Sequence, residues 1–230
     1  MYSSKLNDYN STVELLRPYY SLKNKQPSAV LQNTRLTCIY MQSLLHNNNS
    51  SSIHASYILQ LVDYFQEHHV AMDECSLTIY HVALSERKYY ADAYSNSKEF
   101  VRKYPNSVSS HLAMGEALLA LERITEARSV LNVANMIVTE NGVVNTEYQY
   151  IRRLGDAYYR LNITSNAEYM YTHAYSMLPS STDTYQRCQL LLRTGQLRLK
   201  LNETESAYIA LLSCLQHCPK NTAAILYLGK

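Results

Sequence analysis

The chain of 230 residues contains only five glycines and five prolines. β-Sandwiches and dinucleotide-binding α/β folds use both residues at many turns, so this scarcity argues against those folds and favours a mostly helical protein. Long apolar runs are also lacking. The first 30 residues carry no apolar stretch typical of a secretory signal, and no run of 18 apolar residues occurs that could cross a membrane.

Charge is sparse as well. Charged residues make up 17% of the chain and the net charge is +2, too weak a field to indicate binding to nucleic acid or to an anionic membrane. The five cysteines are odd in number and show no close pairing pattern, which predicts free thiols in a reducing compartment. We therefore expect an intracellular, cytoplasmic protein, with the nucleus as the alternative, that binds neither nucleic acid nor a membrane.

What the sequence does contain is a repeat, marked first by its glycines. Gly115, Gly155, Gly195 and Gly229 are separated by 40, 40 and 34 residues. Small residues recur at fixed distances behind the first three glycines, and prolines follow two of them. An unrelated helical bundle has no reason to hold small residues at a fixed phase. The small residues behind the glycines are Ala127, Ala167 and Ala207 at the first distance and Ala134, Ala174 and Cys214 at the second. The prolines are Pro179 and Pro219.

One unit carries the whole pattern and reads Leu154-Gly155-x2-Tyr158, Ala167-x3-Tyr171-x2-Ala174 and Pro179. It resembles the tetratricopeptide repeat (TPR), a 34-residue helix–turn–helix unit with the pattern L-G-x2-Y, A-x3-F-x2-A, P. The resemblance covers residues 74–230. It implies an all-α fold without a sheet, a TPR α-solenoid of antiparallel helix hairpins wound into a right-handed superhelix.

Each position of the pattern has a physical reason. Glycine at the crossing of two helices lets their backbones approach, and the alanine opposite must be small for the same reason. Proline ends the second helix because it lacks an N–H group and disfavours helix in the preceding residue. The spacing of 40 exceeds the TPR period by six residues. We expect these extra residues in 139–146 and 180–186, where they lengthen a loop or extend the next helix at little cost.

The register predicts about four hairpins and the start of another. The first and second helices of each are expected near 74–87 and 91–104, 108–121 and 125–138, 147–161 and 165–178, and 187–201 and 205–218. The last repeat starts at Thr222 and stops at Lys230, in the middle of its first helix. Half a hairpin cannot bury its apolar face, so we expect the chain to be a fragment of a longer protein.

Residues 1–73 are predicted to form a separate N-terminal helical region. Pro18 should shorten or kink its first helix. The low-complexity run NNNSSS at 47–52 predicts a flexible loop. One interpretation of the second and third helices is a degenerate repeat that caps the array of 74–230, because a terminal repeat must face water. The three predicted helices cover about 10–22, 28–46 and 53–69.

The sequence carries no signature of catalysis. It has no phosphate-binding glycine loop and no G-x-S-x-G, H-E-x-x-H or C-x-x-C pattern, so we predict no enzyme activity, cofactor, metal or small-molecule substrate. The segment 66–75 gathers His, Asp, Glu and Cys, but adjacent histidines point to different sides of a helix, which favours a solvated helix end. Cys214 and Cys218 share a helix face without further ligands. Asn162 and Asn202 begin N-glycosylation patterns and are interpreted as turn residues.

The resemblance also implies where partners bind. In TPR proteins the second, fifth, ninth and twelfth positions of the first helix line the concave face. When these positions are transferred to this chain by the repeat register, together with the flanking arginines, they hold amides, arginines and a tyrosine. Such side chains can bind the backbone or the carboxylates of an extended peptide. The co-chaperone carboxylate clamp is not expected, because acidic residues stand where it needs asparagine. The predicted groove residues are Gln149, Arg152, Arg153, Asp156, Tyr159, Gln189, Arg193 and Gln196.

The function implied is a non-enzymatic protein–protein interaction scaffold or adaptor, a subunit of a larger complex. Its partners would be other proteins, either a peptide or helix segment in the groove or neighbouring TPR subunits. EYQYIRRLGDAYYRL and HCPKNTAAIL are similar to the anaphase-promoting complex subunit 7 group, which gives a TPR subunit of that ubiquitin ligase as one alternative. A regulatory TPR region of a longer, enzyme-containing chain is another.

Overall fold

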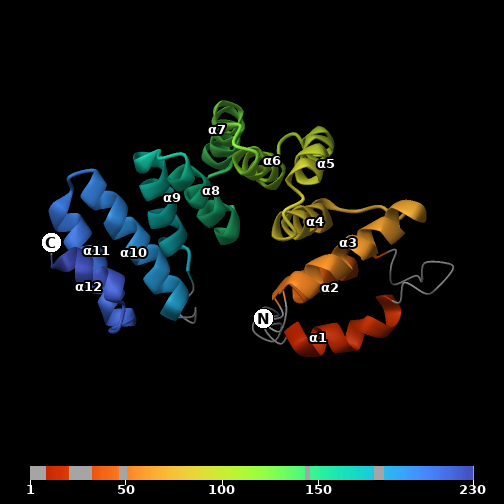
Figure 1. The fold of residues 1–230 in the computed structure, drawn as a ribbon, viewed down its shortest axis with the longest axis horizontal. Helices are drawn as coiled ribbons and strands as arrows, with labels where there is room; N and C mark the ends of the chain where they lie inside the picture. Colours follow the sequence, from red (N-terminus) through yellow and green to blue (C-terminus); the bar gives the residue numbers. More distant parts are fainter. Residues whose placement is uncertain (1–8, 21–32, 47–50, 143–145, 179–183, 230) are drawn as a thin grey trace. The chain divides into compact units, whose positions relative to one another are not determined.

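The computed structural model shows a chain built of helices (Figure 1). It describes residues 9–20, 33–46, 51–142, 146–178 and 184–229, and within these ranges no strand occurs. The chain divides into two compact units, which we call unit 1 (Met1–Leu121) and unit 2 (Glu122–Lys230). The expected division into an N-terminal region of residues 1–73 and a repeat array of residues 74–230 remains a prediction.

Unit 1 begins with a helix that proline cuts short. The α-helical part ends at Leu16, and Pro18 lies in a 3₁₀ turn, because a proline ring cannot continue the α-helical ladder. Ser51 and Ser52, expected in a loop, belong to the first turn of α3, where serine is well tolerated; residues 47–50 of that predicted loop and 28–32 of the second predicted helix lie outside the described part. The elements are α1 (Tyr9–Leu16), η1 (Arg17–Tyr20), α2 (Thr34–His46), α3 (Ser51–Glu67), α4 (Glu74–Glu86), α5 (Tyr90–Lys103) and α6 (Val108–Ala120).

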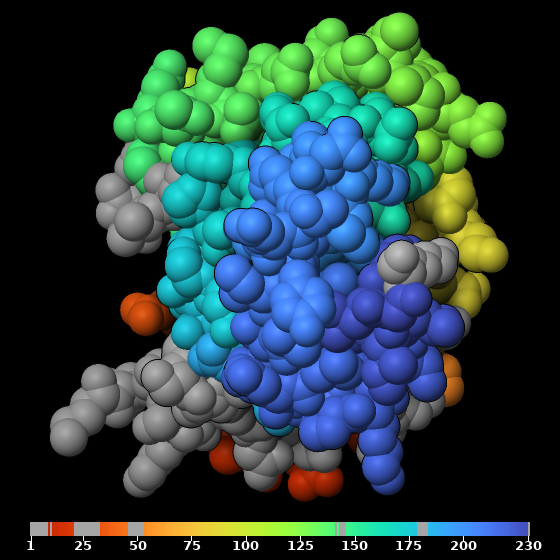
Figure 2. Space-filling model, turned by 90° about the vertical axis from the view of Figure 1, so that its left-hand side faces the viewer, coloured from red at the N-terminus to blue at the C-terminus, as the bar shows by residue number. Residues whose placement is uncertain are grey.

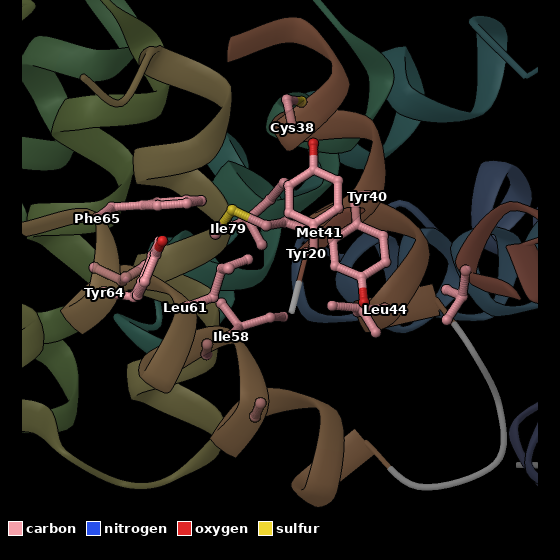
Figure 3. Packing of buried hydrophobic residues seen from close by; sticks show 14 residues of the cluster. Tyr20, Cys38, Tyr40, Met41, Leu44, Ile58, Leu61, Tyr64, Phe65 and Ile79 are labelled. Atoms are coloured by element: carbon pink, nitrogen blue, oxygen red, sulfur yellow. The ribbon is translucent and has the colours of Figure 1, made fainter. Parts of the chain in front are cut away.

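The core of unit 1 is rich in tyrosine. Tyr20 and Tyr40 stack with ring centroids 4.2 Å apart, and both are buried (Figure 3). A buried phenol needs a hydrogen-bond partner, and Tyr20 meets Thr37 Oγ1 at 3.1 Å. The Tyr57 hydroxyl donates to the Tyr20 carbonyl oxygen at 2.7 Å and so ties the 3₁₀ turn to α3. Apolar side chains fill the rest of this core, including Met41, Ile58, Leu61, Phe65 and Ile79.

Two cysteines of unit 1 depart from the sequence prediction. Cys38 of α2 and Cys75 of α4 form a disulfide, with their Cα atoms 5.8 Å apart, a separation typical of such bonds. They are 37 residues apart in sequence, and only the packing of α2 against α4 brings them together. The prediction of free thiols is therefore wrong for this pair, whereas Cys188, Cys214 and Cys218 remain thiols.

Unit 2 consists of helices whose bounds follow the predicted register (Figure 1). The extra residues of the longer repeats extend helices, since α7 runs to Asn141 and α10 starts at Thr184. Helix α11 ends at His217, just before Pro219, while Pro179 lies outside the described residues. The elements are α7 (Ile124–Asn141), α8 (Tyr148–Arg160), α9 (Thr164–Ser176), α10 (Thr184–Lys200), α11 (Thr204–His217) and α12 (Thr222–Leu228).

The repeat glycines of unit 2 lie where paired helices touch. A Cβ atom added at Gly155 of α8 would meet the Tyr171 ring of α9 at 3.0 Å. At Gly195 of α10, an added Cβ would lie 2.7 Å from Leu211 Cγ of α11. Both distances are shorter than ordinary van der Waals contact. The close approach that the sequence pattern predicted at these two glycines is therefore confirmed.

The turn inside each hairpin repeats in the backbone itself. Lys88, Glu122, Asn162 and Asn202 all have φ between 56° and 63°, the left-handed region, and follow the first helix of their pair. Their numbers differ by 34, 40 and 40, the spacing of the repeat. At Asn162 the turn is closed by two hydrogen bonds: the Asn162 N–H donates to the Tyr159 carbonyl oxygen, and the Ile163 N–H donates to the Tyr158 carbonyl oxygen. The interpretation of Asn162 and Asn202 as turn residues is confirmed.

Helices α11 and α12 lie side by side on the face of unit 2 shown in Figure 2. Several large apolar side chains on these two helices are exposed to solvent. Exposed apolar residues gathered on neighbouring helices are typical of surfaces that contact other proteins. The residues, with exposed fractions between 39% and 67%, are Tyr208, Ile209, Leu212, Ile225 and Leu226.

Candidate partner-binding site

The predicted groove residues of α8 recur every three or four positions. Gln149, Arg152, Asp156 and Tyr159 therefore share one face of the helix, and all four side chains are half-buried or exposed. The opposite face is buried and carries the small and apolar residues of the repeat, such as Leu154. Helix α8 is therefore strongly amphipathic, and its polar face is available for contacts outside the hairpin.

Arg152 and Asp156 are linked to the second helix of their hairpin. Arg152 Nη1 lies 3.4 Å from Asp156 Oδ2, and the Tyr171 hydroxyl of α9 donates to Asp156 Oδ1 at 2.7 Å. Burial, and then the nearby Asp156 charge, raise the pKa of Tyr171, so its phenol stays protonated and keeps donating. The Asp156 carboxylate is thus held from two sides, and Arg152 remains about half exposed.

Tyr159 brings α8 and α10 together at the centre of the site. The Arg193 guanidinium carbon lies 4.9 Å from the centroid of the Tyr159 ring, and Lys200 Nζ lies 5.3 Å from the same centroid. Both separations are those of cation–π contacts. Within the described part of the chain, neither cation has a carboxylate within ion-pairing distance. Together with Arg152 and Asp156, these residues give the α8–α10 face three cations and one carboxylate, an excess of positive charge.

The remaining predicted residues flank this centre. Gln189 and Gln196 lie on α10, four residues before and three residues after Arg193, so they share its face and are half-buried. The Gln149 side-chain amide donates to Glu147 Oε2 at 2.7 Å. Arg153 is half-buried and lies about 100° further around α8 than Arg152, so it is at the edge of this face.

Two residues of the site were missed by the sequence analysis. Lys200 was outside the predicted set, although it follows Arg193 by seven residues, which is two helical turns and the same face. Tyr171 was named only as a position of the repeat pattern, and the structure shows it fully buried. A buried tyrosine must still satisfy its hydroxyl, and that need could have directed attention to Asp156.

The other segments considered for ligands have structural contacts. At the end of α3, His68 stacks on Tyr64, while Asp73 accepts the Ser76 N–H at 2.8 Å and so caps α4. Glu74 accepts the Ser107 and Ser109 hydroxyls and ties the starts of α4 and α6. Among the described residues no three His, Cys, Asp or Glu side chains form a metal-binding group, and none of the helices there is long and apolar enough to span a membrane.

No family model matches the sequence, and a search of curated proteins finds no match. Solved structures do resemble the chain. TTC0263, a TPR protein of Thermus thermophilus, aligns with a TM-score of 0.55 at 16% identity, covering 86% of this chain and 97% of its own. MamA (41-end) of Desulfovibrio magneticus aligns with a TM-score of 0.52 at 14% identity, covering 85% and 98%.

YrrB, described as a TPR protein with an unusual peptide-binding site, aligns with a TM-score of 0.50 at 11% identity, covering 98% of this chain and 100% of its own. Identities this low show the fold alone. The fold is that of TPR proteins, an all-α solenoid of helix hairpins, as the repeat pattern predicted.

Proposed function

We propose that this TPR protein is a non-enzymatic interaction scaffold or adaptor, a subunit of a larger complex, that binds a segment of a partner protein on the α8–α10 face. The observation that carries the proposal is the Tyr159 ring with Arg193 and Lys200 beside it. A large, stiff aromatic ring is an effective anchor for another protein, and its two flanking cations have no carboxylate partner among the described residues.

The charges favour an acidic segment. Arg193 presents a planar set of N–H donors that matches a carboxylate, and Lys200 adds a second positive charge on the same helix face. Gln189 and Gln196 lie beside them and offer amides that can bond to an extended peptide backbone. Asp156 does not oppose this, because Arg152 and Tyr171 already engage its two oxygens.

Two further observations support a binding role. The similar protein YrrB is described as having a peptide-binding site on the same fold. The exposed apolar side chains of α11 and α12 add a second surface of the kind through which subunits associate. We assign the predicted groove residues Gln149, Arg152, Arg153, Asp156, Tyr159, Gln189, Arg193 and Gln196, together with Lys200, to the partner-binding face.

The test is selection of peptides from a random-peptide display library on the immobilised chain. We expect enrichment of peptides rich in Asp and Glu. The double variant Arg193→Glu, Lys200→Glu should keep its helical circular dichroism and bind the selected peptides at least about tenfold more weakly, since two charge-assisted contacts are lost. Raising the salt concentration should weaken wild-type binding, because these contacts are only partly buried.

The matched control is Arg128→Glu with Lys220→Glu, which changes the net charge equally at two exposed positions that do not contact Tyr159. It should bind like the wild type. Equal loss of binding in both double variants, or selection of peptides without acidic residues, would refute the assignment of the site.

A further inference from the structure

Two buried thiols meet between α10 and α11. Cys188 Sγ of α10 lies 2.9 Å from Cys214 Sγ of α11, and the two residues are 1% and 0% exposed. The Cys214 thiol also donates to the Cys188 carbonyl oxygen at 3.3 Å. Leu191, Leu211 and Ala224 pack around the pair. The two sulfurs are closer than two thiols in ordinary contact, so little movement separates this pair from a covalent bond.

We propose that Cys188 and Cys214 are a reversible dithiol–disulfide pair, a modification site that a low-molecular-weight disulfide oxidises. This inference uses neither the binding face nor its partner and is independent of the proposed function. In the reaction two protein thiols give up their protons and a sulfur–sulfur bond forms. The oxidant is reduced to two small thiols, which take up the two protons.

A third cysteine gives the oxidant its way in. Cys218, at the end of α11, is half-buried, and its thiol lies 3.8 Å from the Thr184 carbonyl oxygen. It packs against the buried cluster that contains Cys188 and Cys214. Cys218 can therefore form the first mixed disulfide with release of one small thiol. Attack by Cys188 on the Cys218 sulfur then expels the second small thiol, and attack by Cys214 on the Cys188 sulfur moves the bond to the buried pair.

The surroundings explain why the buried thiols need this relay. Burial raises the pKa of both Cys188 and Cys214, which keeps them protonated and slows direct attack on an oxidant. The Asn221 side-chain amide donates to Cys188 Sγ at 3.3 Å and favours its thiolate once the exchange begins. Cys188 is therefore the thiol of the pair best prepared to attack Cys218.

Packing alone does not require a thiol at position 214. In the repeat register this position holds Ala134 and Ala174 in the preceding hairpins, and both alanines are fully buried. A methyl group thus serves the same place in the fold. Cys214→Ala should fold normally, and it removes the proposed bond without opening a large cavity.

The experiment starts from the full chain, reduced and then incubated with glutathione disulfide. Remaining thiols are alkylated, and the chain is digested with trypsin, which releases residues 188–193 on one peptide and residues 201–220 on another. We expect these peptides to be joined, with fragmentation placing the bond at Cys214. Cys218→Ala should give the same product more slowly. The Cys38–Cys75 bond forms in every variant and serves as the internal reference.

The bond should also change stability. It closes a loop with a sequence separation of 26, which lowers the equilibrium constant for unfolding by about a hundredfold to a thousandfold. Oxidation should therefore raise the melting temperature of the wild type and of Cys218→Ala. The rise should be smaller in Cys214→Ala, which cannot form the bond. Absence of the joined peptides, or a bond that remains between Cys188 and Cys218, would overturn the proposal. An equal oxidation rate in Cys218→Ala would overturn the relay.

Discussion

Replacing Gly195 by alanine tests the close packing of α10 on α11. Two effects oppose each other. Alanine in a helix interior is favoured over glycine by about 1 kcal/mol, because the glycine backbone has more freedom to lose. Against this, the new Cβ would stand 2.7 Å from Leu211 Cγ and 2.8 Å from Leu211 Cδ2, and Leu211 is 1% exposed and has little room to move.

Overpacking in a tight core costs about 1–3 kcal/mol, so the clash outweighs the helix propensity. We expect Gly195→Ala to lower the free energy of unfolding by about 1 kcal/mol. For a chain of this size such a loss corresponds to a fall in melting temperature of about 2–4 °C. The carbonyl oxygen of Ala207, 3.4 Å from the new Cβ, adds a smaller contact that cannot move aside without shifting the backbone of α11.

A double-mutant cycle isolates the cause. Leu211→Ala alone should cost about 2–5 kcal/mol by leaving a cavity. In that background the clashing side chain is gone, and Gly195→Ala should become stabilising by up to about 1 kcal/mol. The sign of the Gly195→Ala effect therefore reverses, with a coupling energy of about 1–3 kcal/mol between the two positions.

Urea unfolding followed by circular dichroism measures each variant. The slope of the transition must be compared as well, because repeat arrays unfold less cooperatively than compact domains. Gly229→Ala is the control, since among the described residues the nearest atom to its added Cβ would be the Ile225 carbonyl oxygen at 3.6 Å, an ordinary contact. If Gly195→Ala destabilises equally with and without Leu211, the close approach of these helices is not what requires glycine there.

Two further predictions concern single contacts. Lys88→Gly should raise the free energy of unfolding by about 1 kcal/mol, because Lys88 is exposed and holds a left-handed backbone that glycine adopts freely. Glu86→Gly, at the last residue of α4, should not raise it in the same urea titration, because helical backbone favours other residues over glycine. Tyr171→Phe should cost about 1–2 kcal/mol by removing the donor to the Asp156 carboxylate, and an unchanged urea midpoint would contradict that bond.

The sequence predicted the hairpins well because their signals are local. Helix ends near Pro18 and Pro219 follow from proline chemistry, and small residues such as Gly155 mark crossings wherever the register is known. Where composition was the only guide, the prediction failed: Ser51 and Ser52 continue a low-complexity run but belong to α3. Serine is compatible with both a loop and the first turn of a helix. The packing of the helix therefore determines which of the two conformations Ser51 and Ser52 adopt.

Features made by two distant segments could not be read in the same way. The Cys38–Cys75 bond depends on how α2 meets α4, and the cysteine spacing contains no trace of it. The contact of Tyr159 with Lys200 likewise depends on where α10 lies relative to α8. The sequence predicted which face of each helix is polar, but it could not say which side chains of two faces meet, because that requires their relative position in space.

The left-handed residue that recurs in each hairpin turn, such as Asn162, distinguishes two kinds of connection between helices in this chain. Within a hairpin the turn has a constant length and backbone conformation. A residue inserted there would disturb the packing of the two paired helices. Between hairpins the chain is six residues longer than the 34-residue repeat in two places, and the turns within the hairpins keep the same conformation. Protein engineers who wish to carry a reporter domain or an epitope on this scaffold should therefore splice it between α7 and α8 or between α9 and α10.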